Sequence, residues 1–138
     1  YKRSIPLKLF QSIFDIEDNN IFSLQKNDGA EQINNININN NNFIIFDQNY
    51  DQKPFEDTLC IIKRLDLIIT IDTSIAHISG TLEKNTWLLL SKVCDFRWGM
   101  NAEKSLWYDS VKLYRQRDIN NWGEVINRVK EDLIQMIK

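Results

Sequence analysis

Hydrophobic and polar positions alternate along the chain at spacings that predict helices and strands in succession. Residues 5–14 carry apolar side chains at helical spacing, and residues 21–24 form a short strand-like run after a polar break. Residues 34–42 are an Asn/Ile tract that we interpret as a loop. A buried-strand pattern resumes directly afterwards at residues 43–46. The first third of the chain therefore predicts helix, strand, loop and strand.

The remaining pattern continues this alternation. A helix begins at residues 55–58, and its apolar stripe has the spacing of a face packed on a sheet. Residues 67–71 are nearly all β-branched or apolar, which is typical of a central parallel strand buried on both faces. A helix through about Leu82 follows. In the helix that begins at residues 55–58, the apolar stripe consists of Leu59, Ile62 and Leu65.

Two further strands and a closing helix complete the predicted order. The strands cover residues 86–90 and 111–114, and the amphipathic helix covers residues 122–138. Strands that alternate with helices imply βαβ units, so the sequence predicts an α/β fold: a Rossmann-like parallel sheet flanked by helices. The closing helix directs four residues inward, namely Val125, Val129, Leu133 and Ile137.

Composition narrows the class of protein. The chain has 138 residues, 43% of them hydrophobic, which suits one globular domain. A net charge of −2 argues against bulk attraction to nucleic acid or an anionic membrane. The sequence contains neither a signal peptide nor an apolar run of the ~20 residues that a membrane span needs. Cys60 and Cys94 lie far apart in the sequence, so we expect neither a zinc site nor a disulfide framework, and a cytoplasmic location.

The strongest candidate site runs from Asp72 to Gly80, from the end of a predicted strand into a helix. Asp72, Thr73 and Ser74 end the strand and offer N-cap oxygens. Unpaired N–H groups and the positive dipole end of the helix favour an anion such as a pyrophosphate. His77 follows Thr73 by four residues, so both lie on one helical face and the imidazole can donate to the same phosphate.

A plainer interpretation of these residues remains open. Asp72 or Thr73 would merely cap the helix, and His77, the only histidine in the chain, would be a packed core residue. Capping accounts for most such residues at helix starts. Spacing alone does not separate the two interpretations.

Two further segments follow predicted strands, at the edge where α/β sheets bind ligands. Lys26 would offer a charge to a phosphate and Gln25 a hydrogen bond to a base or ribose, although a lysine in a polar turn is more often only solvated. Arg97 would pair with a phosphate or carboxylate, and Trp98 would stack on a base or sugar. Alternatively Trp98 packs the loop onto the body, and packing is the role that we expect of Trp107.

Several enzyme classes lack their signatures in this sequence. No Gly-rich dinucleotide fingerprint follows a strand, and there is no Walker-type loop, which argues against standard NAD and P-loop enzymes. No Ser/His/Asp or Cys/His order with a recognisable local motif supports a hydrolase. The chain also lacks an Asp-x-Asp pair of the kind that holds metal-bound diphosphates, so we expect no metal and no cofactor.

An ordered set of segments resembles the C-terminal domain of the heptosyltransferase-like glycosyltransferases (family 9), especially bacterial forms in which the transferase follows tetratricopeptide repeats. The set extends over nearly the whole chain and is more specific than any one member. One departure is Glu83-Lys84-Asn85 where the family often has Gly-Lys-Pro, which should change a turn. The matching segments are RSIPL (3–7), FSLQK (22–26), FEDT (55–58), LIITIDTSIAHISG (67–80), DFRW (95–98), SLWY (105–108) and LYRQ (113–116).

The resemblance implies a GT-B type enzyme with two facing Rossmann-like halves. The C-terminal half, here residues 1–138 as a single domain, would bind the nucleoside diphosphate sugar, which is the substrate and partner that we expect. By motif position Gln25 and Lys26 would face the nucleotide and phosphates, and the pyrophosphate and sugar site would be lined by Asp72, Thr73, Ser74 and His77.

The resemblance also implies that the acceptor site and catalytic base belong to an N-terminal half that this chain lacks. Because the chain begins at Tyr1, we expect it to be a piece of a longer protein that transfers no sugar alone. Two alternatives stay open: a non-catalytic nucleotide-binding or scaffold module of a repeat protein, and an epimerase-like relative. Fold alone does not separate them.

Overall fold

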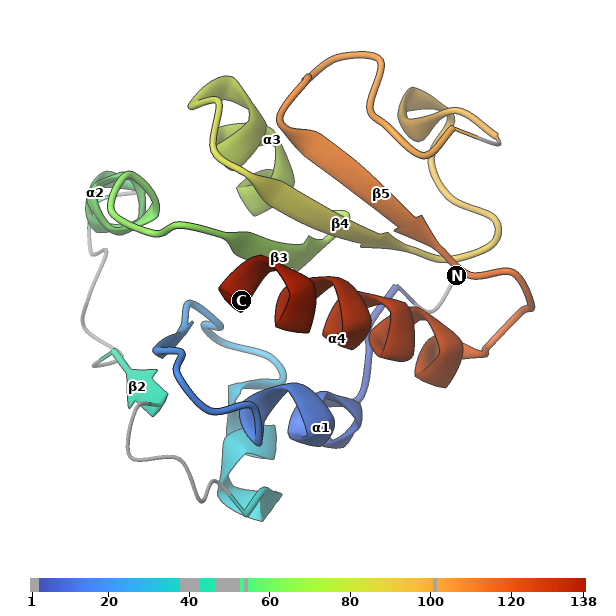
Figure 1. The fold of residues 1–138 in the computed structure, drawn as a ribbon. Helices are drawn as coiled ribbons and strands as arrows, with labels where there is room; N and C mark the ends of the chain where they lie inside the picture. Colours follow the sequence, from blue (N-terminus) through green and yellow to red (C-terminus); the bar gives the residue numbers. More distant parts are fainter. Residues whose placement is uncertain (1–2, 38–42, 47–52, 54, 101) are drawn as a thin grey trace.

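The computed structural model describes residues 3–37, 43–46, 53, 55–100 and 102–138. Its parallel strands form two small sheets flanked by helices, so the chain has an α/β fold (Figure 1). With η for a 3-10 helix, the order is η1 (Leu7–Phe10), α1 (Gln11–Phe14), β1 (Ile21–Ser23), η2 (Ala30–Asn35), β2 (Phe43–Ile45), α2 (Glu56–Ile62), β3 (Ile68–Ile71), α3 (Ser74–Thr81), β4 (Thr86–Leu90), η3 (Phe96–Trp98), β5 (Val111–Arg115) and α4 (Trp122–Ile137).

The larger sheet has the order β3-β4-β5, with all three strands parallel. The sequence places the buried central strand at residues 67–71, but the structure gives that position to β4. All five residues of β4 are buried, whereas β3 is buried only at Ile68. The reason is coverage: β4 has a strand on each side and a helix over each face, while β3 has one neighbouring strand among the described residues.

Side chains alternate along β4 and fill two separate cores. On one face Trp87 and Leu89 pack with Tyr114 against α4. On the other face Leu88 and Leu90 belong to a cluster with residues of α3, η3 and β5. This period of two is the geometry of a strand buried on both sides, and each fully buried Leu or Val contributes ~1.5–3 kcal/mol.

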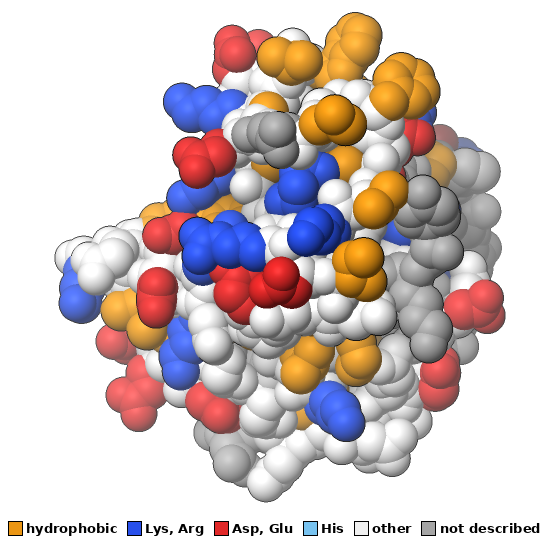
Figure 2. Space-filling view, turned by 90° about the vertical axis from the view of Figure 1, so that its right-hand side faces the viewer, with side chains coloured by type: hydrophobic (Ala, Val, Ile, Leu, Met, Phe, Trp, Pro, Cys, Tyr) orange, Lys and Arg blue, Asp and Glu red, His pale blue; other side chains and the backbone are white. Residues whose placement is uncertain are grey.

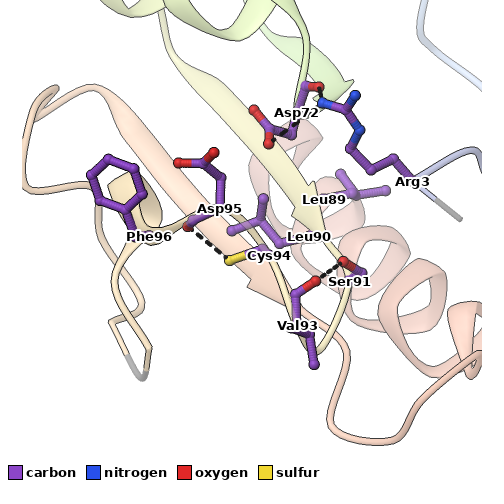
Figure 3. Close-up of a pocket in the computed structure, with 9 residues that line it drawn as sticks. All are labelled: Arg3, Asp72, Leu89, Leu90, Ser91, Val93, Cys94, Asp95 and Phe96. Atoms are coloured by element: carbon purple, nitrogen blue, oxygen red, sulfur yellow. Dashed lines mark hydrogen bonds and ion pairs between the residues drawn. The ribbon is translucent and has the colours of Figure 1, made fainter. Parts of the chain in front are cut away.

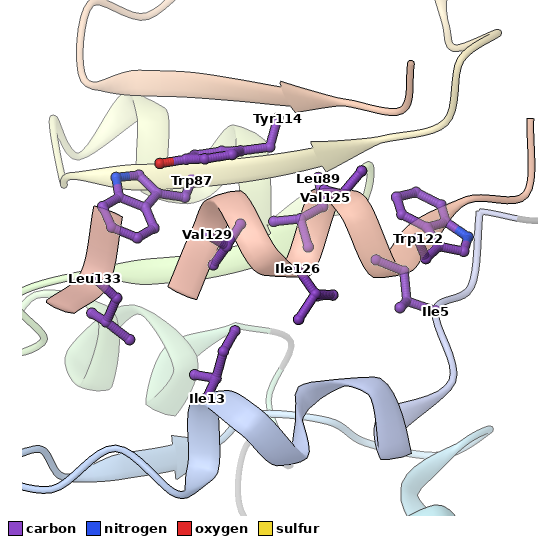
Figure 4. Packing of buried hydrophobic residues seen from close by; sticks show 10 residues of the cluster. All are labelled: Ile5, Ile13, Trp87, Leu89, Tyr114, Trp122, Val125, Ile126, Val129 and Leu133. Carbon is purple, nitrogen blue, oxygen red and sulfur yellow. The ribbon is translucent and has the colours of Figure 1, made fainter. Parts of the chain in front are cut away.

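Helix α4 lies at the centre of the core that contains Trp87, Leu89 and Tyr114. It confirms the amphipathic helix predicted at the end of the chain. Its start is capped by Asn121, whose side chain accepts a hydrogen bond from the Glu124 amide at 3.3 Å. Val125 and Val129 are fully buried against the sheet, and Ile13 reaches the helix from its other side (Figure 4). Helix α4 thus joins the sheet to the N-terminal segments.

The smaller sheet pairs β1 with β2 in parallel, with Ile21 beside Phe43. The sequence predicts one sheet, whereas the described strands form two. Each of these strands has only three residues, and neither is fully buried, so the pair forms a short ladder rather than an extension of the larger sheet. Part of the predicted Asn/Ile loop belongs to η2, and residues 38–42 lie outside the described residues.

Candidate functional site

A pocket of about 440 Å³ lies at the carboxyl ends of β3 and β4 (Figure 3). This edge is where open α/β sheets bind ligands, because the strands end there and the loops diverge. Three segments meet at it: the N-terminal segment, the end of β3, and the connection after β4. The lining residues are Arg3, Asp72, Leu89, Leu90, Ser91, Val93, Cys94, Asp95 and Phe96.

Asp72 is the one residue of the predicted site that lines this pocket. It directly follows β3 and is only 7% exposed. Its backbone oxygen accepts a hydrogen bond from the Arg3 guanidinium at 3.2 Å, and its carboxylate lies 3.9 Å from the same nitrogen. Because the Arg3 side chain is 63% exposed, this pair adds little stability, but it holds a cation at the edge of the pocket.

The start of α3 lies beside Asp72 and agrees with the predicted strand-to-helix transition. Thr73 is the N-cap residue, with an extended backbone (φ −139°, ψ 176°), yet its side chain accepts no hydrogen bond from the helix. Its hydroxyl lies 3.4 Å from the hydroxyl of Thr70 instead. Thr73 and Ser74 are both exposed. The Thr73 side chain therefore leaves the first-turn N–H groups to other acceptors, against the capping interpretation for this residue.

His77, in the first turns of α3, sits in an aromatic cluster with Trp98 and Tyr108. Its ring stacks on Trp98 with 5.1 Å between centroids, and its Nδ1 lies 3.2 Å from the hydroxyl of Tyr108. Tyr108 also packs edge-on against the imidazole at 5.9 Å. His77 does not line the pocket. These contacts favour the packed-histidine interpretation over a shared phosphate site with Thr73.

Arg97 and Trp98 adopt different roles. The Arg97 guanidinium binds the carboxylate of Asp95 in a bidentate pair, at 2.9 and 3.2 Å, and Arg97 does not line the pocket. The backbone hydrogen bond from Arg97 and its guanidinium together lower the pKa of Asp95. Trp98 is 1% exposed, which favours packing over a stacking surface.

The expectation that Trp107 packs onto the body was wrong. Trp107 is 66% exposed, and its indole N–H donates to the backbone oxygen of Arg97 at 2.9 Å. The buried position between α3 and β5 is already filled by Trp98 together with Tyr108. Trp107 therefore ties two parts of the β4–β5 connection together from outside.

Gln25 and Lys26 follow β1 as predicted, but β1 belongs to the smaller sheet. The Gln25 side chain donates to the backbone oxygen of Asp28 at 2.8 Å and closes the turn. Neither residue lines the pocket beside Asp72. The structure thus does not place Gln25 and Lys26 in one pocket with Asp72.

The connection after β4 contributes lining residues to which the sequence assigns no role. Ser91, Val93 and Cys94 directly follow a well-predicted strand, so their position after its carboxyl end is an available signal. Asp95 and Phe96 belong to the segment that the sequence places at this edge, where only Arg97 and Trp98 are given roles. Arg115, the last residue of β5, anchors this connection to the sheet. Its guanidinium donates to the Cys94 sulfur and to the backbone oxygens of Trp98 at 3.0 Å and Gly99 at 2.8 Å.

Comparison with family models, curated proteins and solved structures gave no match. In the described part of the chain, no helix combines the length and apolar character required to cross a bilayer. The described residues also contain no cluster of three or more His, Cys, Asp or Glu side chains arranged to hold a metal ion.

Proposed function

We propose that this chain is the donor-binding half of a GT-B type glycosyltransferase, which transfers a sugar from a nucleoside diphosphate to an acceptor. The observation that carries the proposal is the pocket at the carboxyl ends of β3 and β4, with Arg3 and the start of α3 beside it. The ordered resemblance to the heptosyltransferase-like family supports the same function.

The chemistry of a diphosphate suits one end of this site. Arg3 offers a guanidinium that is only partly engaged by Asp72, and the N–H groups of α3 lie next to that residue. A guanidinium binds phosphate with two parallel hydrogen bonds, and a helix N-terminus favours negative charge. The same groups would stabilise the diphosphate as it departs from the sugar, which is how such a site lowers a transfer barrier.

The other half of the active site would come from a partner domain. By the family resemblance, the acceptor site and the catalytic base belong to an N-terminal half of the same parent enzyme. We therefore expect the isolated chain to bind donor weakly, because one wall of the cleft is missing, and to transfer no sugar.

A second candidate is a nucleotide-binding module without catalysis, and the environment of His77 favours it. The imidazole contacts Trp98 and Tyr108 and does not line the pocket, and these contacts favour a packing role for a residue that the resemblance places at the diphosphate. Assay of the parent protein for sugar transfer separates the two candidates.

Calorimetry on Arg3→Ala tests the proposed site. The ligands are UDP, ADP, GDP and CMP, and a sugar conjugate of each. We expect one nucleotide family to bind and Arg3→Ala to weaken it about tenfold, since a charged hydrogen bond contributes ~1.5 kcal/mol. Lys8→Ala is the control, because Lys8 is an exposed cation of the same segment that does not line the pocket. Binding by none of the ligands, or equal losses in both variants, would overturn the proposal.

A further inference from the structure

Phe96 is an exposed aromatic ring on the wall of the pocket. Its side chain is 86% exposed and yet lines the cavity together with Asp95. Figure 2 looks onto the side of the molecule that carries the β4–β5 connection, and hydrophobic side chains gather on its upper part. The exposed apolar residues of this connection are Val93, Phe96, Met100, Leu106 and Trp107, of which Val93 and Phe96 line the pocket.

Local structure holds Phe96 in this outward position. It is the first residue of η3, and the third residue of the same turn, Trp98, is buried in the body. Asp95 caps the turn by accepting a hydrogen bond from the Arg97 amide at 3.0 Å. An anchored turn fixes the backbone on both sides of Phe96, so its ring is presented to a ligand at a low cost in conformational entropy.

The charges of the pocket are unevenly distributed. Arg3 and Phe96 lie at opposite ends of the lining side chains, with the carboxylates of Asp72 and Asp95 between them (Figure 3). A phosphate is attracted to the Arg3 end, whereas the Asp95 carboxylate is already neutralised by its ion pair with Arg97, which does not line the pocket, so the Asp95 end offers no cation to a phosphate. Carboxylate oxygens only accept hydrogen bonds, and hydroxyl groups are suitable donors. The Asp95 end therefore suits a neutral ligand group rich in hydroxyls.

We propose that Phe96 and Asp95 bind the sugar ring of the donor, with Phe96 as a stacking surface and Asp95 as a hydroxyl acceptor. This inference rests on the proposed function, because it assumes that the diphosphate occupies the Arg3 end. One face of a sugar ring carries C–H groups that pack on an aromatic ring, while its hydroxyls point to the side where Asp95 accepts them. Phe96 is then a specificity-determining residue for the sugar.

The test compares a nucleoside diphosphate with its sugar conjugate on four variants. The ligand pairs are UDP with UDP-glucose, ADP with ADP-glucose and GDP with GDP-mannose. Calorimetry on the whole chain, residues 1–138, measures the affinity for each ligand. We expect Phe96→Ala and Phe96→Leu to weaken the sugar conjugate about tenfold and the bare diphosphate less than twofold. Phe96→Trp retains the stacking surface and the affinity. Leu106→Ala is the control, since Leu106 is 81% exposed on the same connection and does not line the pocket.

The outcomes distinguish a failure of this inference alone from a failure of the proposed function. If the wild-type chain binds the diphosphates and Phe96→Ala weakens diphosphate and conjugate equally, Phe96 contacts the base and the sugar assignment fails while the proposed function stands. If Phe96→Leu behaves as wild type, stacking is not the interaction and the assignment fails again. If the wild-type chain binds no member of any pair, both the inference and the proposed function fail.

Discussion

At the scale of one residue, His77 is a candidate ligand whose contacts favour a packing role. Its contacts with Trp98 and Tyr108 predict that His77→Ala lowers the free energy of unfolding by about 1–3 kcal/mol, because it removes a stacked ring and a hydrogen-bond partner. His77→Phe keeps the stack and should lose less. Urea titration of both variants measures this. An unchanged unfolding midpoint in His77→Ala, with loss of nucleotide binding, would contradict the packing role and support His77 as a phosphate ligand.

Asp132 gives a prediction about pH. Its carboxylate accepts hydrogen bonds from Lys112 at 2.6 Å and from Tyr114 at 2.5 Å, and these lower the pKa of Asp132. Burial, with this hydrogen bond, raises the pKa of Tyr114, which stays protonated as the donor. A lowered folded-state pKa means that the carboxylate stabilises the fold above its ordinary pKa of about 3.9 and that this stability is lost as the pH falls through the folded-state value.

Asp132→Asn should therefore destabilise the chain at pH 7, and the difference should shrink as the pH falls below about 3.9. The side chain is 41% exposed, so solvent screening limits the effect to under ~1 kcal/mol. Urea midpoints of the wild type and variant at pH 7 and at pH 2.5 measure the difference. A gap of equal size at both pH values would mean that the charge of Asp132 plays no part.

At the scale of elements, α3 approaches the β4–β5 connection closely at Gly80. A Cβ built on Gly80 would lie 2.5 Å from the Tyr108 ring, whereas one on Gly123 in α4 meets only a side-chain oxygen at 3.8 Å. Gly80→Ala should therefore destabilise the chain, and Gly123→Ala should stabilise it by roughly 0.4–1 kcal/mol. Thermal unfolding of the pair measures both signs. Stabilisation by Gly80→Ala would contradict the close packing of Tyr108 on α3.

Elements with strong hydrophobic patterns could be predicted from sequence. The run Thr86–Leu90 and the stripe of α4 both appear where the spacing puts them, because an apolar run or a helical stripe has one way to be buried. The pairing of β1 could not be predicted, since three half-buried residues specify no neighbour. Nor could the orientation of Phe96 and Trp98, which depends on how a single 3-10 turn is anchored.

At the scale of the whole molecule, α4 couples the N-terminal segments to the sheet. Ile13 is 4% exposed and belongs to the same core as Trp87 and Val129. Ile13→Ala should cost about 2–5 kcal/mol and leave a single cooperative transition. Ile119→Ala is the control, because Ile119 is 68% exposed and should change stability by at most ~0.5 kcal/mol. A separate early transition in Ile13→Ala would show that the N-terminal segments unfold independently.

The candidate site could be predicted only in part, because some of its contacts join segments that lie far apart in the sequence. Asp72 was found because it ends a strand, and a strand end is visible in sequence. Arg3 and Asp72 are 69 positions apart, so their contact depends on the packing of the N-terminal segment across α4. Long-range arrangements of this kind are not encoded in local spacing.

Ligand mapping by amide NMR tests the central claim, that the carboxyl edge of β3 and β4 binds a nucleoside diphosphate sugar. The labelled chain is titrated with ADP-glucose, UDP-glucose and GDP-mannose. We expect one of them to shift the amides of residues 72–75 and 90–96 while the opposite edge of the sheet, where a pocket of about 330 Å³ includes Glu83 and Lys112, stays unchanged. Shifts confined to that opposite edge, or no saturable shifts with any of the three, would contradict the account.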